Sequence, residues 1–467
     1  MEDRPSADRS SPPDPGSLLR SRDYRVLLAL AALIGVLVSL ASWGYLELIH
    51  YLQQWLYKDL PSGLDLSPVP TWWPLPVLAV ASVPIAFALA RMPGSGGHKP
   101  AEGLKAGPPT QPNQLPGVVL ASLASIGFGM VLGPEAPLIA IAGGLGILAV
   151  RSARKDAPDQ VLALIAGAAS FAAMSSLFGS PIVGAVIIIE AAGLGGATLP
   201  VILLPGLLAA GIGSLVFIGM GSLTGLSSSA YAIAPLSLPK YHAPTLSAFG
   251  WTIVLAAIVA VGIFAIARIG LVVNAATSRR PFVVVPLAAL TVGVLAIAFG
   301  HFSGKPEDLV LFSGQDTMGA VVNQAASFSQ TAFALFLIFK GLAYGVSLGS
   351  ARGGPTFPAM FLGIVAGLLC AHLPGFSEAP AVAALMGAGT VSILRLPLAS
   401  IIIAMVVSQA GASTTPLIIV AVVVAYLVVL ALSASRPSTD PKHLLADSRS
   451  DDGHAASPGI STDELQT

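Results

Sequence analysis

The side chain with the clearest chemical potential is a carboxylate inside an apolar segment. Glu135 lies in Gly133-Pro134-Glu135-Ala136-Pro137, and Gly, Pro and aliphatic residues fill the segment around it. An acid at membrane depth is costly and is usually functional. Because Gly and Pro interrupt a helix here, we expect Glu135 in the first turn of a new helix. At that position the carboxylate is either a functional group or a charge that only stabilises the N-terminus of the helix. We favour a functional group.

The same pattern occurs a second time in the chain. Gly354-Pro355-Thr356-Phe357-Pro358 is also GPxxP, and from Gly133 to Gly354 is 221 residues. Each motif leads into an apolar helix with spaced glycines. A second break follows in each half, at Phe178-Gly179-Ser180-Pro181 and at Leu394-Arg395-Leu396-Pro397. This repeated order predicts two matching halves with the functional site at their interface.

Breaks of this kind suit the binding of an anion. A helix that begins at membrane depth presents its free N–H groups and the positive end of its dipole. A third apolar segment ends at Gly94-Ser95-Gly96-Gly97, where the serine adds a hydroxyl. Partial charges hold an anion weakly enough for it to leave, and an ionised Glu135 would compete with it. We therefore predict Glu135 as the gate of an anion site built from backbone groups at these helix ends and from the hydroxyl of Ser95.

Few other charged side chains lie in apolar segments. Glu190, in a long aliphatic run, is either a proton-path residue or a helix-end carboxylate near the surface. We expect Arg352 and Arg395, which precede the breaks of the second half, at the aqueous mouth. Lys340 is expected to extend its charge to the membrane surface, and His50, at the end of a span, is expected to be interfacial.

The composition of the chain indicates which kind of structure positions these residues. The chain has 467 residues, 54% hydrophobic and 10% charged, with a mean hydropathy of +0.82. A soluble domain carries about 25% charged residues, so a water-soluble protein is excluded. The single cysteine, Cys370, excludes a disulfide scaffold. The net charge is zero and the sequence has no basic stripe, so it does not indicate binding to nucleic acid. The sequence predicts an all-α, polytopic integral membrane protein.

The chain divides by composition into a membrane domain and two polar tails. Residues 1–22 and 436–467 are predicted to be disordered, and residues 23–435 to form the membrane domain. Within it we place repeat 1 at about 73–220 and repeat 2 at about 246–432. The arginines before the first apolar run favour a cytoplasmic N-terminus in the cell membrane, and we expect a cytoplasmic C-terminus as well.

Taken together, the motifs resemble those of the CLC family of chloride channels and chloride/proton antiporters. The family signatures GSGIP, G-K/R-E-G-P and GxFxP are similar, in this order, to the motifs at 94–98, 133–137 and 354–358. The resemblance spans about residues 20–436. It implies a homodimeric fold of two inverted-topology repeats with broken and re-entrant helices and one pore per subunit. It also implies that Ser95 coordinates the anion, that Glu135 is the gate, and that residues 356–358 offer backbone amides. With this resemblance, the predicted anion-binding set is Ser95, Gly96, Thr356 and Phe357.

The sequence departs from the family pattern at several points. Gly97-His98 replaces Ile-Pro in the first motif, and in the third Phe357 stands one place late. The pore tyrosine has no match, because Tyr426 is placed within a helix and the positional equivalent is about Thr439. The inner proton glutamate of the exchangers corresponds to Ala191, next to Glu190. The resemblance leaves open a channel or a proton-coupled exchanger, and we expect a family member without CBS-type domains.

The sequence is compatible with three classes of function. The leading hypothesis is transport of chloride, gated by Glu135, as a channel or a chloride/proton antiporter. The alternative is a secondary transporter of another anion or an organic substrate. A remote alternative is an intramembrane enzyme, although no GxSxG motif accompanies Ser95. We expect no catalytic residue, cofactor or metal. The expected partners are chloride or a similar small anion, protons if transport is coupled, the bilayer and a second copy of the chain, with no nucleic acid.

Overall fold

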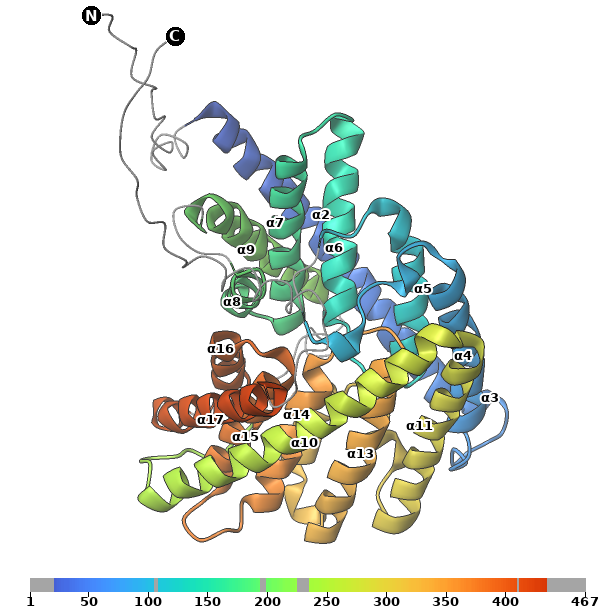
Figure 1. Ribbon diagram of the computed structural model, residues 1–467, viewed down its shortest axis with the longest axis vertical. Coiled ribbons are helices and arrows are strands. Elements are labelled where there is room, and N and C mark those ends of the chain that lie inside the picture. The colour runs from blue at the N-terminus through green and yellow to red at the C-terminus, as the bar shows by residue number, and fades with distance from the viewer. Residues whose placement is uncertain (1–20, 105–107, 194–198, 225–234, 410, 435–467) are drawn as a thin grey trace, which may run out of the picture.

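The described part of the chain is almost entirely helical. The computed structural model describes residues 21–104, 108–193, 199–224, 235–409 and 411–434 (Figure 1). These ranges contain no β-strand, only one isolated bridge between Gly133 and Gly354. The predicted all-α class is therefore confirmed. The predicted tails fall outside the described residues, apart from Ser21 and Arg22.

Long apolar helices form most of the structure. Within the described ranges, nine candidate spans are long and apolar enough to cross a bilayer. The long helices are α2 (Arg22–Gln54), α4 (Pro74–Arg91), α6 (Glu135–Ala153), α7 (Asp159–Phe178), α9 (Leu199–Thr224), α10 (Leu246–Arg279), α11 (Pro281–Ser303), α13 (Gln330–Ser350) and α17 (Thr415–Ala434).

Shorter helices fill the spaces between the long ones. They are α3 (Leu60–Gly63), α5 (Leu115–Ile126), α8 (Pro181–Ala191), α12 (Met318–Asn323), α14 (Thr356–Cys370), α15 (Glu378–Leu394) and α16 (Pro397–Ser408). Helix α14 has 15 residues, which is about 22 Å at 1.5 Å per residue and shorter than the apolar core of a bilayer. Its residues from Thr356 to Leu368 are all buried. Protein, and not lipid, therefore surrounds its first turns, as an interrupted helix requires.

The predicted breaks occur where the sequence placed them. Helix α7 ends at Gly179 in the left-handed conformation that suits glycine, and α8 begins after Ser180, whose hydroxyl caps the amide of Val183. Proline at the first position of α8 needs no N–H partner. Helix α15 similarly ends at Arg395, and α16 begins at Pro397. Local Gly and Pro chemistry thus produces the helix–break–helix order, while the two-repeat boundaries stay a prediction.

Helices of the first half meet helices of the second half where α4 contacts α11 and, at the second pair of breaks, where α8 contacts α16. Helix α14 packs along α15 and against α13, and α6 packs against α7, with α2 and α9 beside α7. In Figure 1, the blue-green helices α2 and α6–α9 form one group and the yellow-to-red helices α10–α17 form another. The beginnings of α6 and α14 lie where these two groups meet.

Candidate functional site

The two GPxxP motifs are joined directly by their backbones. The amide of Gly133 donates to the carbonyl of Gly354 at 2.8 Å, and the amide of Gly354 donates to the carbonyl of Gly133 at 2.5 Å. Helices α6 and α14 begin two residues after these glycines. The reciprocal bonds satisfy backbone groups that the breaks leave free, and they hold two helix N-termini at one place.

The carboxylate of Glu135 lies at this junction. Glu135 is 1% exposed, and its Oε1 accepts a hydrogen bond from the amide of Thr356 at 2.5 Å. Its Oε2 is enclosed and has no hydrogen-bond partner within the described part of the chain. A Cβ on Gly133 or Gly354 would overlap the carboxylate. The glycines therefore leave a space that the Glu135 side chain fills, and the carboxylate covers the amide that we predicted for an anion.

Aromatic side chains surround the start of α14. Phe357 is fully buried and stacks on Phe178 with ring centroids 5.5 Å apart. Phe178 belongs to the second break of the first half, so this contact also links the two halves. The hydroxyl of Tyr344 on α13 donates to the carbonyl of Pro355 at 2.5 Å. The sequence analysis did not identify Tyr344. Its only indication in the sequence was its position ten residues before Gly354, close to the second GPxxP motif.

The Ser95 loop reaches the same region through an arginine. Ser95 has a positive φ of 49° and is exposed, whereas Gly96 is buried. Nε of Arg352 donates to the Ser95 carbonyl at 3.1 Å, and Nη1 donates to the carbonyl of Ala351 at 3.0 Å. Arg352 is 4% exposed, so its expected place at an aqueous mouth is wrong. The structure brings Ser95 and Gly96 to the residues just before Gly354, and a buried cation accompanies them.

Glu190 spans the two halves at the second pair of breaks. Its Oε1 accepts from the amide of Leu398 at 2.9 Å, and its Oε2 accepts from the amide of Ala399 at 2.7 Å. These amides belong to the first turn of α16, where a carboxylate also complements the helix dipole. Two carboxylates of the first half, Glu135 and Glu190, therefore cap helices of the second half. This geometry agrees with a helix-end carboxylate, and the proton-path role stays a prediction.

Two further charged residues behave differently from expectation or were missed. Lys340 does not reach the membrane surface, because it is fully buried and its Nζ donates to the carbonyls of Leu309, Val310, Leu311 and Phe312 at 2.8–3.3 Å. Glu47, within the α2 span, was not recognised as an acid in an apolar run. Its Oε2 is buried without a hydrogen-bond partner in the described ranges. The surrounding run Leu46-Glu47-Leu48-Ile49 was the signal.

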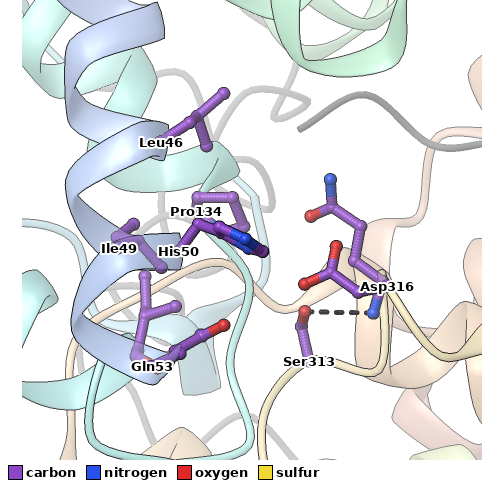
Figure 2. A pocket seen from close by; sticks show the side chains of 9 residues that line it. Leu46, Ile49, His50, Gln53, Pro134, Ser313 and Asp316 are labelled. Atoms are coloured by element: carbon purple, nitrogen blue, oxygen red, sulfur yellow. Dashed lines mark hydrogen bonds between the residues drawn. The ribbon is translucent and has the colours of Figure 1, made fainter. Parts of the chain in front are cut away.

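Cavities border the two neighbours of Glu135 in the chain. A cavity of about 1060 Å³ is lined by Gly94 and Gly97 beside Ser95, by Ala136 on α6, and by small apolar residues of α6, α7 and α8. A second pocket of about 30 Å³ is lined by Pro134 and by polar residues of α2 and the 313–316 loop (Figure 2). The residues immediately before and after Glu135 in the chain thus line two different cavities.

The fold and the site define a class of membrane protein. Buried, broken helices that begin together around a carboxylate are typical of transporters and channels, not of helical bundles with continuous spans. The chain belongs to the voltage gated chloride channel family, whose model matches residues 89–430.

Individual relatives agree with this membership. The "Putative ion-transport protein YfeO" of Shigella boydii serotype 4 (strain Sb227) is 26% identical over 434 residues, covering 91% of this chain and 98% of the relative. The protein of the same name from Escherichia coli (strain K12 / DH10B) has the same identity and coverage.

Solved structures share the fold. A "slow cyanobacterial Cl-/H+ antiporter" superposes with a TM-score of 0.71 at 19% identity, covering 91% of this chain and 97% of that chain. A "CLC-type fluoride/proton antiporter" superposes with a TM-score of 0.64 at 17% identity, covering 86% of this chain and 95% of that chain. The predicted CLC-like membrane fold is confirmed.

Proposed function

We propose that the protein moves a small anion, chloride or one like it, across the membrane, with Glu135 as its gate. The observation that carries the proposal is the bond between Glu135 Oε1 and the amide of Thr356. The carboxylate is itself an anion placed on a helix N-terminus, where the proposed site offers its N–H groups. When Glu135 is protonated or moves away, this amide becomes available to a mobile anion.

The surroundings of Glu135 support this exchange. Gly133 and Gly354 provide space for the departing carboxylate or the arriving anion, because neither carries a side chain. The large cavity is lined by Ala136 and by Gly94 and Gly97, which stand one residue before and two residues after Ser95. We propose that an anion travels from this cavity past Ser95 and Gly96 to the amides of Thr356 and Phe357. Arg352 fixes the Ser95 loop through its carbonyl and adds positive charge nearby.

The proposal has two forms, a channel and a proton-coupled antiporter, and they differ in whether protons move with the anion. The antiporters among the solved structures move a proton against the anion, as their titles state. In this chain Ala191 stands where the resemblance places an inner glutamate, whereas Glu135 is present. We propose that the protein works in the cell membrane as a homodimer with one pathway per subunit and with cytoplasmic termini. A transporter of another anion or an organic substrate stays the alternative.

Flux measurements test the proposal. Purified protein in liposomes should release chloride down its gradient, and a pH electrode in the same chamber should record whether protons move in the opposite direction. Chloride release without proton movement would identify a channel, and coupled movement an exchanger. If neither chloride nor another small anion moves, the proposed function is wrong.

A further inference from the structure

A buried gate needs a route for protons. Glu135 is 1% exposed, and its Oε2 has no hydrogen-bond partner within the described ranges, so this oxygen is the one free to hold a proton. A buried carboxylate exchanges protons only through neighbouring polar groups or water. The polar groups nearest to residue 135 therefore decide the membrane face with which the gate equilibrates.

A small polar pocket meets the Glu135 helix at Pro134. Its volume of about 30 Å³ has room for a water molecule or two. Figure 2 shows His50 of α2 and Asp316 of the 313–316 loop pointing toward each other across it. Gln54 Nε2 and His50 Nε2 are hydrogen-bonded at 2.8 Å, which holds the imidazole in place, and the hydroxyl of Ser313 accepts from the amide of Gln315 at 3.2 Å.

Tyr45 of α2 and Tyr344 of α13 interact electrostatically with Glu135, and the pocket at Pro134 adds two ionisable side chains. Of its nine lining residues, His50 and Asp316 are ionisable, Gln53, Gln315 and Ser313 are neutral and polar, and the other four are apolar. They come from α2, α5, the break before α6 and the 313–316 loop. Glu47 lies one turn before His50 on α2 and is not among the lining residues.

The properties of Asp316 suit proton exchange near neutral pH. The residue is exposed, so it meets bulk water at the mouth of the pocket. Partial removal of its carboxyl from water raises the pKa of Asp316 to about 6, and the charge of His50 opposes the rise. Because water reaches Asp316, screening limits this shift. The carboxyl still releases and takes up protons closer to neutral pH than an ordinary aspartate does.

The larger cavity offers no comparable chemistry. Among its lining residues only His98 is ionisable, and no carboxyl lines the cavity beside it. Most of its wall is Gly, Ala, Ile and Leu. A wide apolar cavity suits the passage of an anion, whereas the paired imidazole and carboxyl at Pro134 suit the passage of a proton.

We propose that the His50–Asp316 pocket is the proton-loading site of Glu135. Asp316 takes a proton from water, and His50 and pocket water pass it beyond Pro134 to Oε2 of Glu135. Each transfer breaks one O–H or N–H bond and forms another, so no further reactant is required. The inference rests on the proposed role of Glu135 as a gate.

Membrane vesicles of defined orientation test this assignment. Right-side-out and inside-out vesicles present opposite faces, so the pH at the pocket face can be changed alone while anion and proton fluxes are recorded. We expect Asp316→Asn and His50→Gln to reduce the response to pH at that face, and to slow any coupled proton flux by roughly tenfold. Asp316→Glu should restore both, because it retains a titratable carboxyl.

A matched control and a fold check make the result decisive. Asp65→Asn removes an exposed carboxyl in the turn after α3, outside the pocket, and should behave like the parent protein. Melting temperatures identify any variant that does not fold, in which case the remaining pocket variant decides. If folded Asp316→Asn or His50→Gln matches Asp65→Asn in pH response and proton flux, the pocket assignment is wrong. If the parent protein itself moves no anion, the proposed function fails first.

Discussion

Oε1 of Glu135 accepts a hydrogen bond from the backbone amide of Thr356, which lies 221 residues further along the chain. The bond joins the first residue of α6 to the first residue of α14. It is supported by the reciprocal bonds between Gly133 and Gly354. A side chain of one half thus occupies the helix N-terminus of the other half, and the following predictions depend on this relationship.

Gly354→Ala should open the gate without removing the carboxylate. The three atoms nearest to an added Cβ all belong to the Glu135 carboxylate, so that side chain must move off the Thr356 amide. We expect faster anion flux and a weaker dependence on pH. The flux assay should be repeated in a Glu135→Ala background, where the same substitution has nothing to displace and should change little. Gly262→Ala, on an open face of α10, is the control. A large effect of Gly354→Ala in both backgrounds would contradict the account.

Ser95→Ala tests the entrance to the proposed site. Loss of the hydroxyl should change the ratio of nitrate to chloride flux, because a hydroxyl donor interacts differently with the two anions. The bond from Arg352 to the Ser95 carbonyl involves the backbone and should survive. Liposome flux in matched gradients of the two salts measures the ratio. An unchanged ratio would place the Ser95 side chain outside the anion path.

Glu190→Gln separates a structural role from a proton-path role. The amide side chain retains one oxygen, so one of the two amides at Leu398 and Ala399 should lose its acceptor. We expect a lower melting temperature, corresponding to a loss of about 1 kcal/mol, with the proton-to-anion ratio unchanged. A fall in proton flux at constant anion flux would instead assign Glu190 to the proton path.

Lys340→Met should destabilise the protein without acting on the gate directly. The ammonium group donates to four consecutive carbonyls and lies 5.2 Å from the centre of the Phe361 ring. Hydrogen bonds to a charged group are each worth about 1.5–3 kcal/mol, so we expect a loss on the order of 3 kcal/mol. Thermal unfolding in detergent, compared with the exposed Lys240→Met, measures it. Equal melting temperatures would show that these bonds contribute nothing.

Local sequence chemistry predicted the helices and their interruptions. Gly179-Ser180-Pro181 terminates one helix and starts another through backbone conformation, a hydroxyl cap and a missing N–H, all of which are encoded within three residues. The repeated GPxxP motif likewise placed Glu135 and Thr356 at helix starts. Both predictions depend on interactions over a few residues.

Contacts over long separations were harder to predict. The sequence does not indicate that residues 309–312 fold over α13, so Lys340 was expected at the surface. Nor does it indicate that the carbonyl of Ser95 lies beside Arg352, 257 residues away. Asp316 and His50 line one pocket because a loop after α11 lies beside the end of α2 (Figure 2). Each of these contacts depends on tertiary packing.

The central claim is that Glu135 gates an anion path, and one paired measurement tests it most directly. Chloride efflux and proton movement should be recorded together from liposomes that contain the parent protein or Glu135→Ala. The account predicts that the parent releases chloride with a rate that depends on pH, and that Glu135→Ala still releases chloride but has lost this dependence and any proton movement. Glu135→Ala with the pH dependence of the parent protein would contradict the account.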